Sequence, residues 1–222
     1  VFPEPEPYKI DYPKIPPGVD VQCSNGTQLF ESTCKAFKTI FDNDLTKGSS
    51  ISDQLQLVPK PGAVPQHAKT RRYSQEDREL ISTTTDGYVK NHIAEEIEGG
   101  SEWLSSALIV PQPNKKRMCT DFSPVNRELE KWRSLIPSPE ELFEFTRGKK
   151  FLAKFDLTSG YHQFFLDPNS RKYTAFYTQK GIFQFIRVPF GIHTAPGFFS
   201  KVMRKILAGC EGARGYFDDI LV

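Results

Sequence analysis

Apolar residues recur at helical spacing most clearly over 198–207, where they would form one stripe against a core before Gly209. Two further helices are predicted from their first turns. Ser74 and Ser138 each precede an acidic residue by three positions, which is the pattern of a capping box. An interruption of the first of these helices near Gly87 is left open. The predicted helices cover 74–98, 139–147 and 198–207.

Strand-like sequence takes over between the helices, in runs rich in alternating, β-branched or aromatic residues. Two pairs of runs are joined by short polar linkers and are predicted to be hairpins. The predicted strands are 105–111 with 116–122, 173–178 with 182–188, and the single strands 151–157 and 216–222. Helices that cover one face of a mainly antiparallel sheet make an α+β fold.

The N-terminal part of the chain has a different pattern. Residues 1–17 hold six prolines, which lack the N–H that a helix needs and favour extended backbone. We interpret residues 1–36 as a proline-rich tether, with a short amphipathic segment over 29–41. Residues 37–74 are predicted to form an extended lead-in segment, which is rich in serine, glycine and proline from Ser49 to Ala68.

Composition adds one asymmetry to this picture. The chain of 222 residues is 38% hydrophobic and 25% charged, as globular proteins are, and its net charge is +2. Residues 1–100 hold 11 basic and 15 acidic residues, or −4, whereas residues 101–222 hold 18 and 12, or +6. A basic second half suits a polyanionic partner, although a solvated face gives the same count.

Membrane and cysteine sites are not expected. The longest uninterrupted apolar run has four residues, 107–110, whereas a membrane-spanning helix needs about twenty. No signal peptide is recognisable after Val1, and the chain reads as a part of something longer. The four cysteines are not spaced as zinc ligands or as a disulfide framework, so free thiols are predicted.

Acidic residues occupy two strand-like runs, 155–157 and 216–222, in which acids are disfavoured. Asp218 and Asp219 are adjacent, and adjacent carboxylates repel each other and lose solvation when they are buried. A cation would compensate them and Asp156, and Mg²⁺ prefers such hard oxygen ligands. Because a straight strand would place the adjacent acids on opposite faces, we expect the backbone to bend there. A solvated turn is the alternative interpretation.

These acidic runs resemble two motifs of reverse transcriptases. Residues 216–219, Tyr-Phe-Asp-Asp, are similar to the Y-x-D-D motif. Residues 155–163, Phe-Asp-Leu-Thr-Ser-Gly-Tyr-His-Gln, resemble the preceding motif, which has an aspartate and an aromatic residue five positions later. The resemblance to gypsy-type LTR retrotransposon polymerases covers about 37–222. Its further segments, in the family's order and spacing, are 60–62, 102–106, 117–122, 167–173, 188–191 and 195–196.

The resemblance implies a right-hand polymerase fold for residues 75–222. Its fingers would comprise about 75–148 and 169–187, and its palm about 149–168 and 188–222. The thumb would be absent and the palm truncated, because the family continues after the last aspartate with the return strand of the Y-x-D-D hairpin. Residues 220–222 are accordingly expected to form an unpaired strand, which is an aggregation liability.

The implied activity is RNA-directed DNA polymerisation, in which deoxynucleotides are added to a primer 3′-hydroxyl by two-metal catalysis. The implied catalytic residues are Asp156, Asp218 and Asp219. Asp156 and Asp218 would bind two Mg²⁺ ions, for which Mn²⁺ can substitute, while Asp219 would support the pair electrostatically. The backbone carbonyl of Leu157 would complete a coordination shell, because the strand end is expected to leave it free.

Nucleotide binding is assigned through the same resemblance. Tyr161 matches the sugar gate, a ring beneath the incoming ribose with which a 2′-hydroxyl collides, and a packed palm aromatic is the alternative. Arg117 matches the fingers arginine that reaches the triphosphate, with a plain surface arginine as the alternative. Lys115 or Lys116 would substitute for the family's usual fingers lysine. The other residues assigned to the nucleotide are Thr158, Ser159, Gly160, Phe190 and Gly191.

Two histidines, the binding partners, the location in the cell and the residues that contact template and primer complete the predicted picture. His162 and His193 are interpreted as polar fillers. The implied partners are an RNA or DNA template with its primer, deoxynucleoside triphosphates, and the rest of a Pol polyprotein: thumb, connection, ribonuclease H and integrase. The implied location is a cytoplasmic virus-like particle, or the nucleus with an integration complex. The residues assigned to template and primer are Arg171, Lys172, Arg187, Tyr216 and Phe217.

Two other functions stay open on the sequence. The chain could be an inactive retroelement remnant that acts at most as a nucleic-acid-binding or interaction module. A two-metal nuclease or phosphatase would instead hydrolyse its substrate without a primer. In that case the sugar-gate aromatic would have no purpose.

Overall fold

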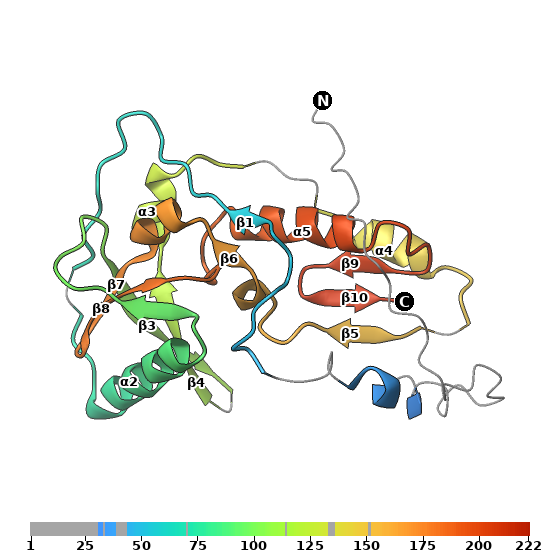
Figure 1. Cartoon of the computed structure of the whole chain (residues 1–222), viewed down its shortest axis with the longest axis horizontal. Helices are drawn as coiled ribbons and strands as arrows, with labels where there is room; N and C mark the ends of the chain where they lie inside the picture. The colour runs from blue at the N-terminus through green and yellow to red at the C-terminus, as the bar shows by residue number, and fades with distance from the viewer. Residues whose placement is uncertain are drawn as a thin grey trace.

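The computed structural model shows two neighbouring lobes joined by one hydrophobic core (Figure 1). One lobe is built on a five-stranded sheet and the other on a three-stranded sheet. The predicted tether lies almost wholly outside the described residues, as does much of the predicted amphipathic segment 29–41. The structure describes residues 31–32, 34–38, 44–69, 71–113, 115–132, 136–150 and 152–222.

The five-stranded sheet has the order β2-β8-β7-β3-β4. The predicted β3–β4 hairpin is confirmed, with an antiparallel register from Ser106 opposite Asp121 to Gln112 opposite Lys115. A parallel pairing of β3 with β7 joins the two predicted hairpins into one sheet. The strands are β2 (Ala94–Glu96), β3 (Ser105–Gln112), β4 (Lys115–Asp121), β7 (Phe176–Thr178) and β8 (Gly181–Phe185).

Helix α2 (Gln75–Lys90) packs against β2 and β4 of this sheet (Figure 1). The side chain of Ser74 accepts a hydrogen bond of 3.2 Å from the backbone N–H of Asp77, so the predicted cap is confirmed. The cap satisfies one of the N–H groups that the first turn leaves without a helical partner.

The predicted end of this helix near Glu98 is wrong. His92 has a φ of 52°, which turns the chain after Lys90, and residues 94–96 pair with β8 instead. Strand pairing is favoured here because it buries Ile93 and Ala94, which are each 2% exposed. The partner strand lies far away in the sequence, so local helix propensity gives no sign of this pairing.

The second predicted hairpin is shorter than expected. β7 and β8 pair with Phe176 opposite Phe183, but residues 168–174 form a 3₁₀ helix, η3 (Pro168–Thr174). Asp167 caps this helix by accepting a hydrogen bond of 3.0 Å from the Asn169 N–H. Proline at the first helical position and the aspartate cap outweigh the strand tendency of the residues that follow.

The three-stranded sheet is antiparallel and has the order β5-β10-β9, with β5 (Lys154–Asp156), β9 (Arg214–Tyr216) and β10 (Asp219–Leu221). The predicted single strand 216–222 is wrong, because the run crosses a tight hairpin and β10 is the return strand. The expected unpaired strand is also wrong. β10 is the central strand, and Val222 exchanges hydrogen bonds of 2.9 and 3.0 Å with Ala153.

Helices α4 (Pro139–Thr146) and α5 (Ala195–Ile206) lie along the three-stranded sheet (Figure 1). Ser138 caps α4 by accepting a hydrogen bond of 3.2 Å from the Glu141 N–H, as predicted. A short helix, α3 (Ser123–Glu128), follows β4. The predicted apolar stripe of α5 is confirmed, and its buried members are Phe198, Phe199, Val202 and Met203.

The lead-in segment is extended, as predicted, and it is also part of the core. β1 (Gln54–Leu55) pairs in parallel with β6 (Phe165–Leu166) between the two lobes (Figure 1). Leu55 and Leu57 are 1% and 5% exposed. The segment therefore helps to hold the lobes together and is more than a connector.

The predicted α+β class is confirmed. Among the described strands, the pairs β3–β7 and β1–β6 are parallel and the other pairs are antiparallel. In the part of the chain that the structure describes, no helix has the length and apolarity to cross a bilayer.

Candidate active site

The three predicted catalytic acids meet at one end of the three-stranded sheet. Asp219 lies opposite Asp156 across β5 and β10, and opposite Tyr216 across the hairpin. Phe217 and Asp218 form the two-residue turn, and the φ of Phe217 is 47°. Two-residue hairpins require a positive φ at this position. The bend expected between the adjacent acids is therefore confirmed.

The carboxylates of the hairpin lie in surroundings that destabilise their charged form. Burial raises the pKa of the Asp218 carboxyl above its ordinary value, and the charges of Asp156 and Asp219 raise it further. Lys154 Nζ lies 2.9 Å from one oxygen of Asp219. Asp218 Oδ1 and Asp219 Oδ1, however, are buried without a hydrogen-bond partner among the described residues. A buried charged oxygen without a partner destabilises a fold.

These two oxygens fit a divalent cation, which would supply the missing partner. Carboxylate oxygens are the hard ligands that Mg²⁺ takes. Asp156 adds an exposed carboxylate from the neighbouring strand. Within the described ranges, no three His, Cys, Asp or Glu side chains are grouped as a ready-made metal site. The observation that favours a cation is therefore the pair of unpartnered carboxylate oxygens, with a third carboxylate on the neighbouring strand.

The backbone turns back immediately after β5, and the Leu157 carbonyl accepts a hydrogen bond within this turn. The Leu157 N–H donates to the Asp218 carbonyl at 2.8 Å, and the Leu157 carbonyl accepts from the Gly160 N–H at 3.1 Å. The prediction that the strand end leaves this carbonyl free is wrong. The chain enters a 3₁₀ helix, η2 (Gly160–Gln163), and the Thr158 carbonyl also accepts a side-chain hydrogen bond, from Gln163.

Gly160 lies directly against the Asp218 carboxylate. Ser159, with a φ of 49°, reverses the chain before it. A Cβ atom on Gly160 would lie 2.6 Å from Asp218 Oδ1 and 3.2 Å from the ring of Phe199. Cβ atoms do not approach an oxygen that closely, so the site needs a residue without a side chain here.

Tyr161 is wedged between two aromatic rings beside the acids. Its ring centroid lies 5.0 Å from that of Phe190 and 5.2 Å from that of Phe199, both edge-on. Burial, with a further contribution from the charge of Asp218, raises the pKa of the Tyr161 hydroxyl to about 12. The side chain therefore stays neutral, and its ring is held close to the site of the predicted chemistry.

The two neighbours Lys116 and Arg117 point to opposite faces of β4, because side chains alternate along a strand. The Arg117 guanidinium lies 5.0 Å from the centroid of the Phe190 ring, and its charge lowers the pKa of Asp218. Lys116 instead pairs with Glu76 at 2.7 Å and Asp77 at 3.0 Å in the first turn of α2. The structure therefore brings Arg117 to the acids and takes Lys116 away from them, while Lys115 shares the face of Arg117.

A residue that the sequence did not single out holds the loop containing Gly191. Asn126 of α3 donates to the Gly191 carbonyl at 2.8 Å and accepts from the His193 N–H at 3.0 Å. Gly191 itself has a φ of 94°. Phe199 and Lys154 were missed as well, since a buried phenylalanine and an exposed lysine have no local pattern that marks them as partners of Tyr161 and Asp219.

Arg187 does not line a template path, and that prediction is wrong. The side chain is fully buried, at 1% exposure, and it donates hydrogen bonds to three backbone carbonyls. Arg171 pairs with Glu95 at 3.4 Å, and Lys172 is exposed beside the ring of Tyr173. Both remain on the surface of the five-stranded lobe.

The two histidines behave as the sequence suggested. His162 is 5% exposed among aromatic rings, and burial lowers its pKa to about 4, so it is neutral near pH 7. His193 has Nδ1 2.8 Å from Asn126 Oδ1 and Nε2 3.1 Å from the Glu130 carbonyl. Neither ring is placed to take a proton from a substrate.

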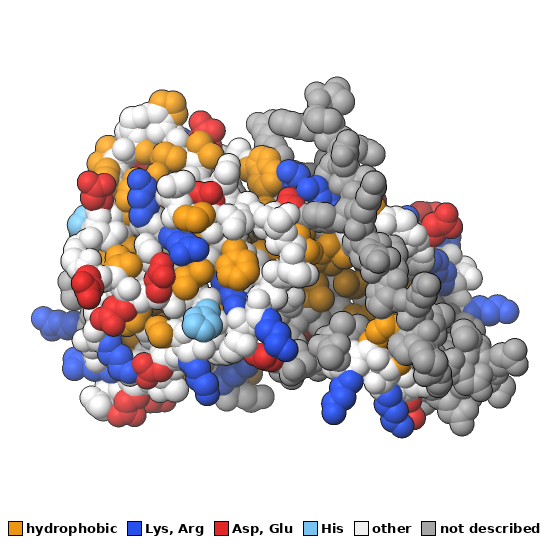
Figure 2. All heavy atoms as spheres, in the orientation of Figure 1, with side chains coloured by type: hydrophobic (Ala, Val, Ile, Leu, Met, Phe, Trp, Pro, Cys, Tyr) orange, Lys and Arg blue, Asp and Glu red, His pale blue; other side chains and the backbone are white. Residues whose placement is uncertain are grey.

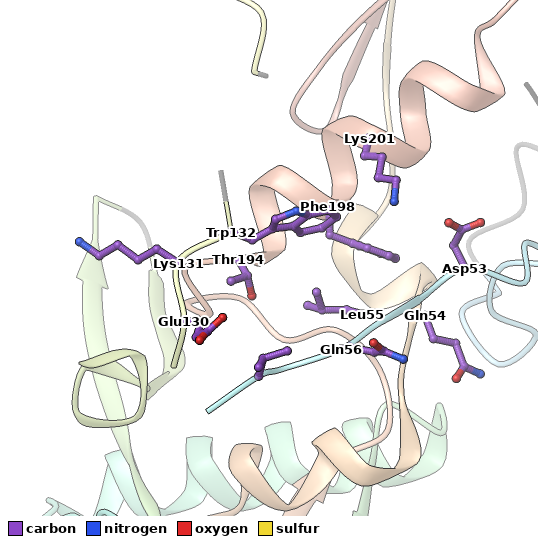
Figure 3. A pocket seen from close by; sticks show the side chains of 11 residues that line it. Asp53, Gln54, Leu55, Gln56, Glu130, Lys131, Trp132, Thr194, Phe198 and Lys201 are labelled. Carbon is purple, nitrogen blue, oxygen red and sulfur yellow. The ribbon is translucent and has the colours of Figure 1, made fainter. Parts of the chain in front are cut away.

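The predicted catalytic acids do not line the cavity that lies between β1 and α5. A cavity of about 320 Å³ lies between β1, the segment 130–132 and α5 (Figure 3). Its walls include Trp132, Phe198 and the buried Thr194, and none of the predicted catalytic acids lines it. On the face seen in Figure 2, basic and acidic side chains are interspersed over the five-stranded lobe, so the positive excess of the second half forms no single-sign patch there.

Comparison with known proteins gives a consistent result. Residues 107–222 match the family described as reverse transcriptase (RNA-dependent DNA polymerase). The chain is 29% identical over 204 residues to the retrovirus-related Pol polyprotein from transposon 412 of Drosophila melanogaster, covering 86% of this chain and 16% of that protein. It is 34% identical over 166 residues to the enzymatic polyprotein of figwort mosaic virus (strain DxS), covering 69% and 24%.

The fold matches a solved structure as well. The crystal structure of a prototype foamy virus protease–reverse transcriptase mutant superposes with a TM-score of 0.74 at 18% identity, covering 88% of this chain and 26% of that one. The chain spans between 16% and 24% of the two polyproteins named above. With the family match covering more than half of its residues, the chain belongs to the reverse transcriptase (RNA-dependent DNA polymerase) family.

Proposed function

We propose that this chain carries the nucleotidyl-transfer site of an RNA-directed DNA polymerase, which adds deoxynucleotides to a primer 3′-hydroxyl on an RNA or DNA template. One observation supports this most. The acids of the hairpin, the ring of Tyr161 and the guanidinium of Arg117 surround the same open surface. Carboxylates suit metal ions, a guanidinium suits phosphate, and an aromatic ring suits a sugar or base.

In this proposal Asp156, Asp218 and Asp219 would hold two Mg²⁺ ions, for which Mn²⁺ can substitute. When bound, such ions lower the pKa of the attacking hydroxyl and stabilise the leaving pyrophosphate. Lys154 orients Asp219 through their pair of 2.9 Å. The missing side chain of Gly160 lets Asp218 keep its position.

The nucleotide would lie between β4 and η2. Arg117 and Lys115, on one face of β4, donate hydrogen bonds to triphosphate oxygens in this proposal. Tyr161, supported by Phe190, lies beneath the sugar, and residues 158–160 form the adjoining backbone. Because two rings pack against Tyr161, its position is fixed before a nucleotide arrives, which lowers the entropic cost of binding.

We assign the five-stranded lobe to fingers, about 75–148 and 169–187, and the three-stranded lobe to a palm, about 149–168 and 188–222. The tether and the lead-in segment precede them. The thumb, connection, ribonuclease H and integrase would come from the rest of a Pol polyprotein. Tyr216 and Phe217, at the hairpin turn, are placed to meet the primer end, and Phe217 is 40% exposed.

The deciding experiment is Mg²⁺-dependent extension of oligo-dT on poly-rA by a polymerase that contains this chain and the thumb. Asp218→Asn keeps the size of the side chain and removes its charge. Metal ions contribute several kcal/mol to such reactions, so we expect a loss of at least about 10³-fold. Asp86→Asn is the matched control, because Asp86 pairs with Lys180 on the far side of the five-stranded lobe.

Three other results of this experiment would lead to three different conclusions. Extension that survives Asp218→Asn while Asp86→Asn behaves as wild type would overturn the assignment of the acids. A wild-type protein that binds template and primer without extending them would be an inactive remnant. Degradation of the template without a need for primer would indicate a nuclease.

A further inference from the structure

The most deeply buried charge of the described chain belongs to Arg187. Its side chain is 1% exposed, and its partners are backbone carbonyls and not carboxylates. Burying a guanidinium without an acid is costly unless its N–H groups are satisfied. An apolar side chain of similar volume would fill the space more cheaply. The arginine therefore has a role that needs its fork of donors.

The three side-chain hydrogen bonds of Arg187 reach three segments that are far apart in the sequence. Nη2 donates to the Thr46 carbonyl at 2.8 Å, Nε to the His92 carbonyl at 3.0 Å, and Nη1 to the His162 carbonyl at 3.1 Å. They belong to the lead-in segment, the turn after α2 and the 3₁₀ helix η2. The planar, rigid guanidinium fixes the relative positions of these carbonyls, as a flexible lysine could not.

Of these segments, η2 bears on the chemistry. His162 follows Tyr161 directly, and Gly160 touches the Asp218 carboxylate. A short 3₁₀ helix has weak hydrogen bonds of its own and depends on its surroundings for its position. The hydrogen bond from Arg187 to the His162 carbonyl therefore helps to position the preceding residue, Tyr161, whose ring lies beside the acids.

The lead-in segment makes a further hydrogen bond to η2. The Ser49 N–H donates to the Gln163 carbonyl at 2.6 Å. Gly48, with a φ of 63°, passes so close that a Cβ there would lie 2.9 Å from the ring of Phe165 and 3.2 Å from the guanidinium carbon of Arg187. Residues 46–49 thus form a clamp that holds Arg187 against η2.

We propose that Arg187 is a positioning residue for nucleotide selection: by tying the His162 carbonyl to the lead-in segment, it holds Tyr161 where its ring screens the sugar of the incoming nucleotide. This role rests on the proposed polymerase function. The lead-in segment becomes a working part of the nucleotide site, although none of its residues would touch the nucleotide.

Hydrogen exchange in the metal-free chain tests the mechanical part of the proposal without catalysis. Arg187→Lys keeps the charge and loses the fork, and Gly48→Ala pushes on Arg187 from the lead-in segment. Ile81→Ala, in α2, is the control, because it destabilises a buried contact away from η2. Amides 160–164 should exchange at least about tenfold faster in the first two variants, as expected for one lost charge-assisted hydrogen bond. At a comparable loss of Tm, Ile81→Ala should leave them unchanged.

Single-nucleotide extension by the polymerase tests the functional part. Arg187→Lys and Gly48→Ala should lower the selectivity for deoxy- over ribonucleotides about tenfold, with a larger change in KM than in kcat, because a displaced ring distorts binding geometry. A purely structural role predicts that all three variants lose activity in proportion to Tm with selectivity intact, and that result would overturn the proposal. If the wild-type enzyme adds no nucleotides, the polymerase function fails and selectivity fails with it, while the exchange data still decide whether Arg187 anchors η2.

Discussion

In the five-stranded lobe several charged side chains pair with side chains of opposite sign, whereas the hairpin of the three-stranded lobe holds carboxylate oxygens that have no such partner among the described residues. Lys116 pairs with Glu76 and Asp77, Lys180 with Asp86, and Arg71 with Asp121, at 2.6 to 3.0 Å. At the hairpin, Asp218 Oδ1 and Asp219 Oδ1 are buried without such partners among the described residues.

The backbone differs in the same way. β3 and β4 pair regularly over seven positions, whereas β9 and β10 meet at a turn in which a phenylalanine adopts a φ of 47°. A bulky residue in that conformation costs about 1–3 kcal/mol. Strain and unpaired charge coincide at the hairpin, as expected if the proposed metal ions supply the partners that the protein does not. The five-stranded lobe, by contrast, has the regular β3–β4 pairing and brings Arg117 close to the acids.

Among variants that keep all three acids, adding one methyl group at Gly160 should lower kcat the most. In Gly160→Ala the new Cβ would lie 2.6 Å from Asp218 Oδ1, so the carboxylate or the loop must move. A displacement near 1 Å at a catalytic group costs about 10²-fold, and we expect kcat to fall by that factor in primer extension. Gly87→Ala is the control, since nothing lies within 4 Å of that Cβ and alanine suits a helix interior. Undiminished activity in Gly160→Ala would show that the position of Asp218 is not critical.

Removing the ring of Tyr161 should change substrate choice more than rate. Tyr161→Ala leaves room for a 2′-hydroxyl, and discrimination by one small group is worth about 10–200-fold. We expect ribonucleotide incorporation to rise within that range, measured by competing ATP against dATP on a poly-dT template. Tyr161→Phe keeps the ring and should keep the selectivity. If Tyr161→Ala discriminates like wild type, the ring is a packing residue.

Replacing each of the two neighbouring cations of β4 in turn distinguishes the proposed nucleotide contact from the contact with α2. Arg117 faces Phe190 and the acids, whereas Lys116 faces α2. A charge-assisted hydrogen bond is worth about 1.5–3 kcal/mol, so Arg117→Met should raise the KM for dNTP about 10–100-fold. Lys116→Met should leave KM unchanged and alter Tm little, because exposed pairs contribute little to stability. Equal effects on KM from both variants would contradict the opposite orientations.

The sequence predicted those parts of the molecule that depend on local chemistry. The caps at Ser74 and Ser138, the β3–β4 hairpin and the bend between the two acids follow from residues a few positions apart. The resemblance supplied the metal and nucleotide roles, and the structure brings Arg117, Tyr161 and the acids together.

Long-range partners explain what the sequence could not predict. Residues 94–96 become a strand because β8 lies alongside them, with Glu95 opposite Gln184. Arg187 is buried because carbonyls of Thr46, His92 and His162 converge on it from three distant segments. No local pattern distinguishes such an arginine from one that faces a template.

The smallest predicted effect is a gain of stability on removing a catalytic charge. Since the folded state raises the pKa of Asp218, ionised Asp218 destabilises the fold without metal, and Asp218→Asn should raise Tm at pH 7. Solvent screening at this partly exposed site limits the gain to under about 1 kcal/mol, or about 2–4 °C for a chain of this length. Thermal unfolding in EDTA measures it.

The pH dependence of this Tm difference tests whether ionised Asp218 destabilises the fold. A raised folded-state pKa gives stability that is present below the unfolded pKa of about 3.9 and is lost as pH rises through the folded value, so the advantage of Asp218→Asn should vanish toward pH 3. Asp121 is the contrast from the five-stranded lobe: the hydrogen bond from Ser123, with the charge of Arg71, lowers its pKa. Asp121→Asn should therefore lower Tm at pH 7, with the difference shrinking as pH falls. The same sign for both variants would show that the two lobes do not differ in how they hold charge.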